Sequence, residues 1–375
     1  MDEKIRGVNL GNWLVLEKWM EPKVFEGTEA EDETWLARML PEEELKRRMK
    51  AHRDTYITKE DFAYISEKGI NTIRIPVPYF IFGDVKPFIG CIEYLDKAFE
   101  WAMEYKLKIL IDLHTAPGGQ NGYDNGGITG VCRWHKNPKY VRFVINVLMR
   151  LANRYGGNDN LFGIEVLNEP ISWPVYMTSP TRKKAANPEE VRNSGYVPFA
   201  FLTTFYKTVY WNLRKILPLD KAIVFHDGFR LHNWNYFFMS NDFKNVYLDS
   251  HIYISAMENF TKIHNPLMYK SYLGMDKLRL KLASKSVPVI IGEWCINNSY
   301  AGNMKKGNLS EEDYKKAQAG RYRKVAQMEL DTWDNTSGWF YWNYKLFNNP
   351  EDYAREKWKE SWDFRQCIKN KWLKL

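Results

Sequence analysis

Eight short apolar runs rich in β-branched residues recur along the chain, and amphipathic stretches separate them. We predict strands at residues 5–11, 71–76, 108–114, 162–168, 222–227, 245–251, 287–293 and 338–343. These runs are apolar on both faces rather than alternating, which is typical of parallel strands covered by helices. Eight strands alternating with helices is the pattern of a (β/α)8 TIM barrel, an α/β fold. The sequence therefore predicts a single domain of this architecture over residues 1–375.

The stretches between the strands have helical periodicity, and several end in Gly or basic residues, as helix C-termini prefer. A doubly wound sheet is the competing architecture, but no GxGxxG follows the first run and no phosphate loop occurs. Three connections are long, at 12–57, 115–137 and 170–198. We interpret 12–57 and 170–198 as loop insertions of one domain, because neither has the composition of a linker.

Bulk properties exclude several classes of function. The net charge is +8, but Lys and Arg interleave with Asp and Glu and form no basic stripe, so nucleic-acid binding is not expected. The four cysteines are isolated and predict neither a zinc site nor a disulfide framework. No apolar run is long enough to span a membrane, and no signal-peptide pattern precedes the first strand, so we expect a cytoplasmic protein. The oligomeric state does not follow from the sequence.

The carboxyl ends of the predicted strands carry a recurring set of polar and aromatic residues. In a (β/α)8 barrel these ends form the floor of the active site. They supply Arg74, His114, Asn168, Glu169, His226, Asp227, His251, Tyr253, Glu293, Trp294 and Trp342. Each residue alone has a plain structural explanation, but their occurrence at the same end of successive strands indicates a site.

Glu169 and Glu293 are the two glutamates of this set. Two carboxylates that face one another, with no metal or cofactor motif, are the minimum for cleaving a glycosidic bond. One must stay protonated to donate to the leaving oxygen, and the other must stay ionised to attack the anomeric carbon. We expect Arg74 to lower the pKa of Glu293 and Tyr253 to donate a hydrogen bond to it. No cofactor and no metal are expected.

The remaining strand-end residues suit a sugar ligand. Asn168 can bond the hydroxyl beside the reacting carbon, and His114 and His251 are interpreted as neutral donors to sugar hydroxyls. Trp342 offers a flat apolar floor for a pyranose ring. The expected partner is an oligosaccharide or glycoside substrate.

This ordered set resembles glycoside hydrolase family 5. The resemblance rests on "IRIP" with Arg74, "DLH" with His114, "LNEP" with Asn168 and Glu169, "SHIY" with His251 and Tyr253, "GEW" with Glu293, and Trp342. Members of that family are retaining β-glycosidases on (β/α)8 barrels. The resemblance implies that Glu169 is the acid/base and Glu293 the nucleophile. Retention requires carboxyl groups about 5–5.5 Å apart, whereas more than ~6.5 Å would imply inversion.

The N-terminal two thirds is similar to the exo-β-1,3-glucanase branch of that family, through "RGVNLGNWLVLEKWMEPKVFE", "DFAYISEKGINTIRIPVPYF", "DLHTAPGGQNGYDNGG" and "IVFHDGF". The resemblance implies that Glu17 binds a hydroxyl of the terminal sugar. It also implies that Tyr123 clamps the next sugar, with Asn125 a binding residue of the same motif. The chain departs from the branch at Asn12, where Gly is usual, and in the longer loop 171–198. It also runs "ISAMENF" where a second clamp aromatic is usual, so that half of the clamp is absent or moved to Phe260.

We therefore predict a retaining exo-β-glycosidase that releases terminal β-linked glucose from short oligosaccharides or glycosides by double displacement. The connections 12–57 and 170–198 are expected to close one end of the cleft into a pocket, which admits chain ends. Glucose and mannose differ in one hydroxyl, so a β-mannosidase acting on short mannosides or glycan cores is the alternative. A non-catalytic carbohydrate-binding barrel and a transglycosylase remain as further alternatives.

Overall fold

The fold is a closed barrel of parallel strands. The computed structural model describes residues 4–179, 184–354 and 356–375. Each strand pairs with its neighbours in chain order, and the last strand pairs with the first. The strands are β1 (Ile5–Asn9), β2 (Thr72–Val77), β3 (Lys108–Leu113), β4 (Leu161–Glu165), β5 (Ala222–His226), β6 (Val246–His251), β7 (Val289–Trp294) and β8 (Gly338–Tyr341). The predicted (β/α)8 barrel is confirmed.

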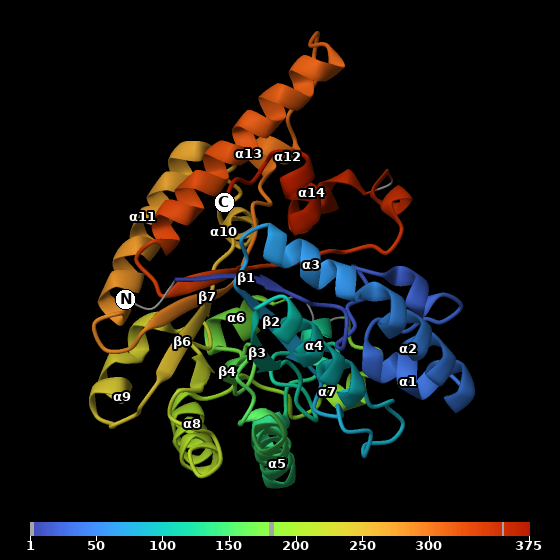
Figure 1. Cartoon of the computed structure of the whole chain (residues 1–375), viewed down its shortest axis with the longest axis vertical. Helices are drawn as coiled ribbons and strands as arrows, with labels where there is room; N and C mark the ends of the chain where they lie inside the picture. The colour runs from blue at the N-terminus through green and yellow to red at the C-terminus, as the bar shows by residue number, and fades with distance from the viewer. Residues whose placement is uncertain (1–3, 180–183, 355) are drawn as a thin grey trace.

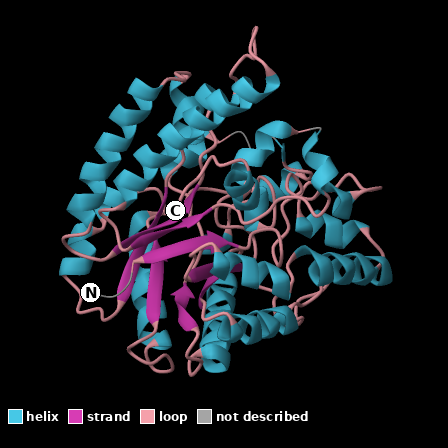
Figure 2. Ribbon diagram, turned by 45° about the horizontal axis from the view of Figure 1, so that its top comes forward, coloured by secondary structure: helices cyan, strands magenta, loops and turns pink. Residues whose placement is uncertain are grey.

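Helices surround the strands on the outside of the barrel (Figure 2). The α-helices are α1 (Glu33–Met39), α2 (Glu42–Tyr56), α3 (Lys59–Glu67), α4 (Ile92–Glu104), α5 (Pro138–Tyr155), α6 (Trp173–Thr178), α7 (Pro188–Val191), α8 (Phe199–Leu213), α9 (Asn235–Met239), α10 (Ile254–Thr261), α11 (Pro266–Ala283), α12 (Ser299–Gly302), α13 (Glu311–Trp333) and α14 (Phe364–Lys369). Short 3₁₀ helices are η1 (Pro22–Phe25), η2 (Asp124–Gly126), η3 (Trp134–Lys136), η5 (Leu231–Asn233), η6 (Pro350–Ala354) and η7 (Lys357–Trp362).

Local sequence signals set several helix starts. Thr58 and Asp61 form a capping box at the start of α3, and each satisfies a backbone N–H that the first turn leaves free. The side chain of Asn137 accepts from Lys139 N–H at the start of α5, where Pro138 occupies the first turn. The capping side chain at α13 is that of Ser310, which accepts from the backbone of Asp313.

Three strands end at least two residues earlier than predicted. β1 stops at Asn9, β4 at Glu165 and β8 at Tyr341. After β4 the chain still bonds to its neighbour, because Asn168 N–H donates to the carbonyl of Leu113 at 2.9 Å. It then turns at Glu169, whose φ of 47° lies in the left-handed region. Asn168 and Glu169 therefore lie at the rim of the barrel rather than inside a strand.

The barrel interior has an apolar layer near the amino ends of the strands and a polar layer above it. The apolar layer contains Ile5, Leu110, Ala222, Val224, Ile290 and Phe340. Alternate residues of a strand face the same side. Asp112 and His114 follow Leu110 at every second position, so their side chains also point into the barrel. His226 follows Val224 in the same way. Packing of the lower layer thus aims the polar residues at the mouth.

The long connections hold more helix than predicted. The connection 12–57 contains η1, α1 and α2, which lie beside the barrel at the right of Figure 1. Trp13 anchors it, fully buried, by donating from Nε1 to the carbonyl of Arg53 at 3.0 Å. The connection 170–198 contains α6 and α7, and its residues 180–183 lie outside the described part of the chain.

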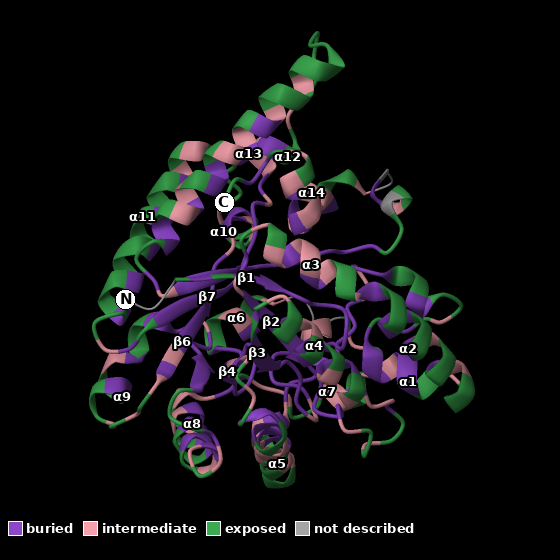
Figure 3. Cartoon of the chain, viewed as in Figure 1, coloured by how far each residue is buried: buried purple, intermediate pink, exposed green. Residues whose placement is uncertain are grey.

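Exposure follows the layers of the fold. Figure 3 shows the strands buried and the first turns of α13, at the top, exposed. Among the described residues, no helix combines the length and apolarity that crossing a membrane requires.

Candidate active site

Arg74 lies at the centre of the polar layer and is fully buried. Its Nε donates to Glu165 at 2.7 Å, and its Nη1 donates to Asn9 at 2.9 Å and to Glu293 at 3.0 Å. Its Nη2 donates to the side-chain oxygen of Asn168 at 2.9 Å. A guanidinium offers its donors in a rigid planar fork. Arg74 therefore fixes Glu293, on β7, and Asn168, beyond β4, relative to one another.

Glu293 also receives the expected hydrogen bond from Tyr253, whose hydroxyl lies 2.7 Å from Oε2. Burial raises the pKa of Glu293, and the neighbouring charge of Glu169 raises it further. The charges of His251 and Arg74 lower the pKa but do not outweigh these effects. Arg74 thus lowers the pKa of Glu293 as predicted, but the net pKa is raised, because the carboxylate is buried next to a second acid.

His251 connects three carboxylates. Its Nδ1 lies 2.9 Å from Oε1 of Glu169 and 3.4 Å from Oε2 of Glu293, and its Nε2 lies 3.3 Å from Asp249. Burial lowers the pKa of His251, but the charges of Glu293 and Asp249 outweigh burial, so the pKa lies well above its ordinary value. His251 is therefore an imidazolium, and its interpretation as a neutral donor is wrong.

Glu169 is held on both of its oxygens. Asn125 donates to Oε2 at 3.1 Å, and Asn121 orients that amide by donating to its oxygen at 2.9 Å. Burial raises the pKa of Glu169, but the hydrogen bond and charge of His251 outweigh burial and lower the pKa to about 2. The expectation that this carboxyl stays protonated is therefore wrong. The proton is one hydrogen bond away, on His251.

The two carboxylates face one another across His251. Because both contact the same imidazole nitrogen, at 2.9 Å and 3.4 Å, Oε1 of Glu169 and Oε2 of Glu293 are at most about 6.3 Å apart. This limit applies to the two oxygens that face His251, and it is compatible with the short carboxyl separation that retention requires.

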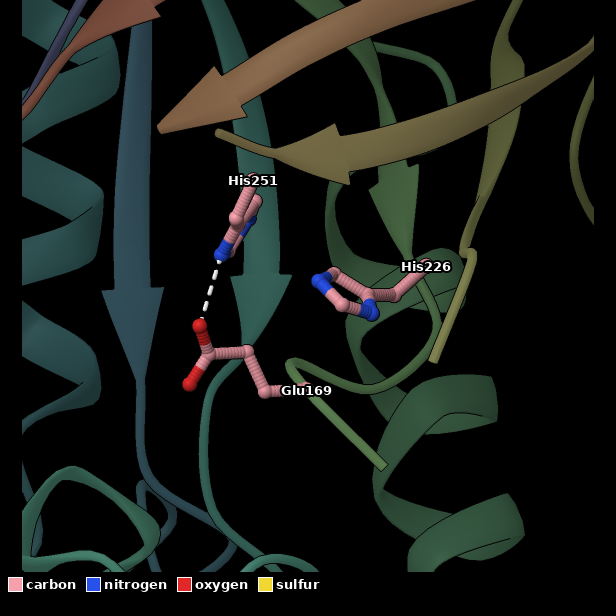
Figure 4. A group of neighbouring side chains, drawn as sticks. All are labelled: Glu169, His226 and His251. Atoms are coloured by element: carbon pink, nitrogen blue, oxygen red, sulfur yellow. Dashed lines mark hydrogen bonds and ion pairs between the residues drawn. The ribbon is translucent and has the colours of Figure 1, made fainter. Parts of the chain in front are cut away.

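Figure 4 shows His226 beside the pair formed by Glu169 and His251. One ligand atom from each of these three residues lies within 4.8 Å of the others, a spacing that suits a metal. However, Nδ1 of His226 accepts from Gly228 N–H at 2.9 Å, so the proton of this neutral ring is on Nε2. Burial, followed by the charge of His251, lowers the pKa of His226 to about 3. A protonated Nε2 and an imidazolium are poor metal ligands, so these three residues do not fit a metal site.

His114 is tied into the floor of the site. Its Nδ1 donates to Asp112 at 2.5 Å, which leaves Nε2 to accept from Nδ2 of Asn168 at 3.4 Å. The predicted role as a donor to sugar hydroxyls is therefore wrong, because Asp112 fixes the other tautomer. The ring stacks on Trp342 with centroids 5.8 Å apart. Gly11 allows this packing, since a Cβ there would lie 2.7 Å from the Trp342 ring.

Glu17 reaches the site from the connection after β1. Its backbone N–H donates to the side chain of Asn12 at 2.8 Å, and Trp19 donates to its Oε2 at 2.8 Å. Asn12 has a φ of 63°, which explains why Gly is usual there, and Asn tolerates this region better than most residues. Burial, followed by the charge of Asp124, raises the pKa of Glu17 well above its ordinary value.

These groups meet at a cavity of about 290 Å³, which we call the mouth cavity. It is lined by Glu17, Trp19, Asn125, Glu169, Tyr253, Glu293, Trp342, Trp358 and Trp362. Other predicted residues, Arg74, His114, Asn168 and His251, are buried and hold the lining in place through the hydrogen bonds above. Tyr123 is half-buried next to η2 and is not among the lining residues. Phe260 is 84% exposed on α10 and does not replace the missing clamp.

Sequence reasoning missed two groups of residues. The aromatic side of the mouth cavity comes from Trp19, Trp358 and Trp362. The buried acids Asp112, Glu165 and Asp249 were not selected, although each interrupts an apolar strand. A carboxylate inside such a strand is costly unless it is paired. That signal was available in the sequence and pointed to the buried cation of Arg74.

Comparisons with known proteins agree with this geometry. A family model described as cellulase (glycosyl hydrolase family 5) matches residues 41–348. A probable glucan 1,3-beta-glucosidase A of Emericella nidulans is 32% identical over 98% of this chain and 89% of the relative. Glucan 1,3-beta-glucosidase 2 of Candida albicans is 28% identical over 99% of this chain and 83% of the relative. The crystal structure of a rutinosidase from Aspergillus niger shares the fold, with a TM-score of 0.71, 23% identity, and coverage of 95% of this chain and 98% of that chain.

Facing carboxylates at the mouth of a closed parallel barrel, together with the family match, define the class as a retaining glycoside hydrolase. The family match covers most of the chain, and the two glucosidase relatives align with nearly all of it. The chain belongs to glycosyl hydrolase family 5.

Proposed function

We propose that the protein is an exo-acting β-glycosidase that releases terminal β-linked glucose from short oligosaccharides or glycosides. The observation that carries this proposal is that Glu169 and Glu293 line one small cavity together with Glu17 and Trp19 from the connection after β1. Walls on that side favour the end of a chain over its interior. Relatives named glucan 1,3-beta-glucosidase support glucose as the sugar and a β-1,3 linkage.

In the first step Glu293 attacks the anomeric carbon while the leaving oxygen takes a proton from Glu169. Tyr253 and Arg74 each donate to a different oxygen of Glu293, which orients it for attack. The proton that Glu169 donates comes from Nδ1 of His251, across 2.9 Å. Its transfer leaves a neutral Glu169 beside a neutral imidazole, in position to donate.

The covalent intermediate changes the charges of the site. Esterified Glu293 has no charge, so it no longer holds a proton on His251 by attraction. Glu169 is then an ionised base in the second step, and it accepts a proton from the water that attacks the intermediate. The same side chain thus serves as acid and then as base.

A non-catalytic carbohydrate-binding barrel is a weaker candidate. Glu169 and Glu293 are both directed at His251 and at the same cavity, and each has bonds that fix its orientation. A barrel without catalysis has no need to bury two acids against one imidazolium, because desolvation makes that arrangement costly.

The test is hydrolysis of nitrophenyl β-glucoside, nitrophenyl β-mannoside and β-1,3-linked glucose oligosaccharides by the wild type and Glu293→Gln. We expect cleavage of the glucoside, glucose as the first product from the oligosaccharides, and loss of both in the variant. Cleavage of the mannoside alone would overturn the proposed sugar, and internal cleavage of longer chains would overturn exo action.

A further inference from the structure

A second cavity, which we call the side cavity, adjoins the mouth cavity. It has a volume of about 470 Å³ and lies between α12, the first half of α13, η7 and the C-terminal segment. In Figure 1 the short helix α14 lies to the right of α13, below its upper end. It is lined by Gly302, Glu311, Tyr314, Lys315, Gln318, Tyr322, Lys357, Trp358, Glu360, Asn370 and Trp372. Trp358 lines both cavities, so the two share this side chain.

Trp358 is 54% exposed, yet its neighbours hold the helix that carries it. The next residue, Lys359, is only 3% exposed, and its Nζ donates to the carbonyl of Trp19 at 2.6 Å and lies 2.8 Å from Glu356. The same ammonium lies 5.6 Å from the centroid of the Trp358 ring and 4.9 Å from that of Phe347. Contacts of a buried cation with aromatic faces are favourable. Lys359 therefore ties η7 to the connection after β1 and presents Trp358 as a fixed platform.

The far wall of the side cavity combines aromatic rings with amides. Tyr314 is half-buried there, and its hydroxyl donates to the carbonyl of Met304 at 3.1 Å. Gln318 donates from Nε2 to the carbonyl of Ala301 at 3.2 Å and to the hydroxyl of Tyr314 at 3.3 Å. Sugar rings present apolar faces that stack on aromatic rings, and hydroxyls that pair with planar polar groups. The wall has both kinds of partner.

The charges around the side cavity balance. Two acids, Glu311 and Glu360, are opposed by two lysines, Lys315 and Lys357. An anion-binding site needs an excess of positive groups, and a cation site needs an excess of negative groups. A balanced lining with aromatic rings favours an uncharged polar ligand.

We propose that the side cavity is an accessory carbohydrate subsite, which holds the sugar units of an uncharged β-linked oligosaccharide that lie outside the mouth cavity. This inference rests on the proposed function, because the occupant is part of the substrate of that reaction. Trp358 contacts both the sugar in the mouth cavity and the sugar in the side cavity. Tyr314 and Gln318 bind only the sugar in the side cavity.

The experiment compares kcat/KM for nitrophenyl β-glucoside with kcat/KM for β-1,3-linked glucose oligosaccharides of increasing length. We expect kcat/KM of the wild type to increase with the length of the oligosaccharide. In the double variant Tyr314→Ala, Gln318→Ala the gain should fall about tenfold, because it loses a stacking partner and a hydrogen bond. Activity on the nitrophenyl glucoside should change by less than about twofold. Tyr236→Ala is the matched control, since Tyr236 lies on α9 and is 82% exposed.

A full length dependence in the double variant would overturn the subsite. If the wild type cleaves no glucoside, the proposed function fails, and the subsite is then tested by calorimetric titration of Glu293→Gln with the same oligosaccharides. Binding that Tyr314→Ala, Gln318→Ala abolishes supports the subsite in that case, and unchanged binding overturns it.

Discussion

His251 donates from Nδ1 to Oε1 of Glu169 at 2.9 Å, and both side chains are buried. In the unliganded enzyme the positive charge stays on the imidazole, because Glu293 and Asp249 also attract it. Glu169, the proposed acid, therefore receives its proton from His251 and does not hold it through its own affinity. This relationship sets the pH range in which the enzyme can work.

The first prediction concerns that pH range. The first step needs the proton that Glu169 and His251 share. This proton is held to high pH, because the pKa of His251 is raised well above its ordinary value. The alkaline limb of the profile of kcat/KM against pH should therefore lie well above neutral pH in the wild type. In His251→Gln the limb should move down by at least about one pH unit, because Glu169 must then hold the proton alone. An alkaline limb at the same pH in both proteins would contradict this account.

The second prediction concerns the role of Glu169. Glu169→Ala should lower kcat/KM about 10²–10⁴-fold for a substrate with a poor leaving group. The loss should be smaller for a dinitrophenyl glycoside, which needs no proton to depart. Azide should restore turnover of that substrate and give a β-glycosyl azide, since a small anion can enter where the carboxylate was. Asn125→Ala serves as the control, because it removes a hydrogen bond to Glu169 at 3.1 Å but keeps the acid. An α-configured azide would reverse the assignment.

The third prediction concerns Asn12, whose φ is 63°. Asn12→Val should destabilise the fold by roughly 2 kcal/mol or more, because β-branched residues are strained in the left-handed region. Asn12→Gly should cost less, about 1 kcal/mol, since it removes only the hydrogen bond to Glu17 N–H at 2.8 Å. Urea unfolding monitored by tryptophan fluorescence gives both values. Equal stability of the Val and Gly variants would refute the explanation.

The fourth prediction concerns Glu329 on α13, whose two carboxylate oxygens are buried without a partner among the described residues. Burial raises its pKa well above the ordinary value. The folded state therefore binds a proton on Glu329 more tightly than the unfolded state does. The stabilisation that comes from this proton is lost as pH rises toward the folded pKa. Glu329→Gln does not titrate, so its Tm advantage over the wild type should grow with pH, reaching about 2 °C or more. Glu312→Gln, on the exposed part of the same helix, should give no such trend.

The positions of the candidate catalytic groups could be predicted from the sequence, because barrel topology brings every carboxyl end to one rim. That rule places Glu169 and Glu293 at the rim, and the family resemblance distinguishes them from the other strand-end residues. Their protonation could not be predicted, since it depends on Asp249 and His251, which approach them only in three dimensions. Trp358 and Trp362 could not be placed either. They lie well beyond β8, and a buried contact between Lys359 and the carbonyl of Trp19 sets their position.

Arg74 belongs to β2, but its guanidinium is compensated by Glu165 of β4 and by Glu293 of β7. A fragment that ends after β4 would keep this cation and lose one of its counter-charges. The complementary fragment would keep Glu293 and lose the cation. Separating buried partners in this way costs about 3–5 kcal/mol, which is a large share of the stability of a typical domain. The two half-barrels are thus not independent modules, and engineered hybrids that exchange one half for that of another enzyme must carry a matching charge across the junction.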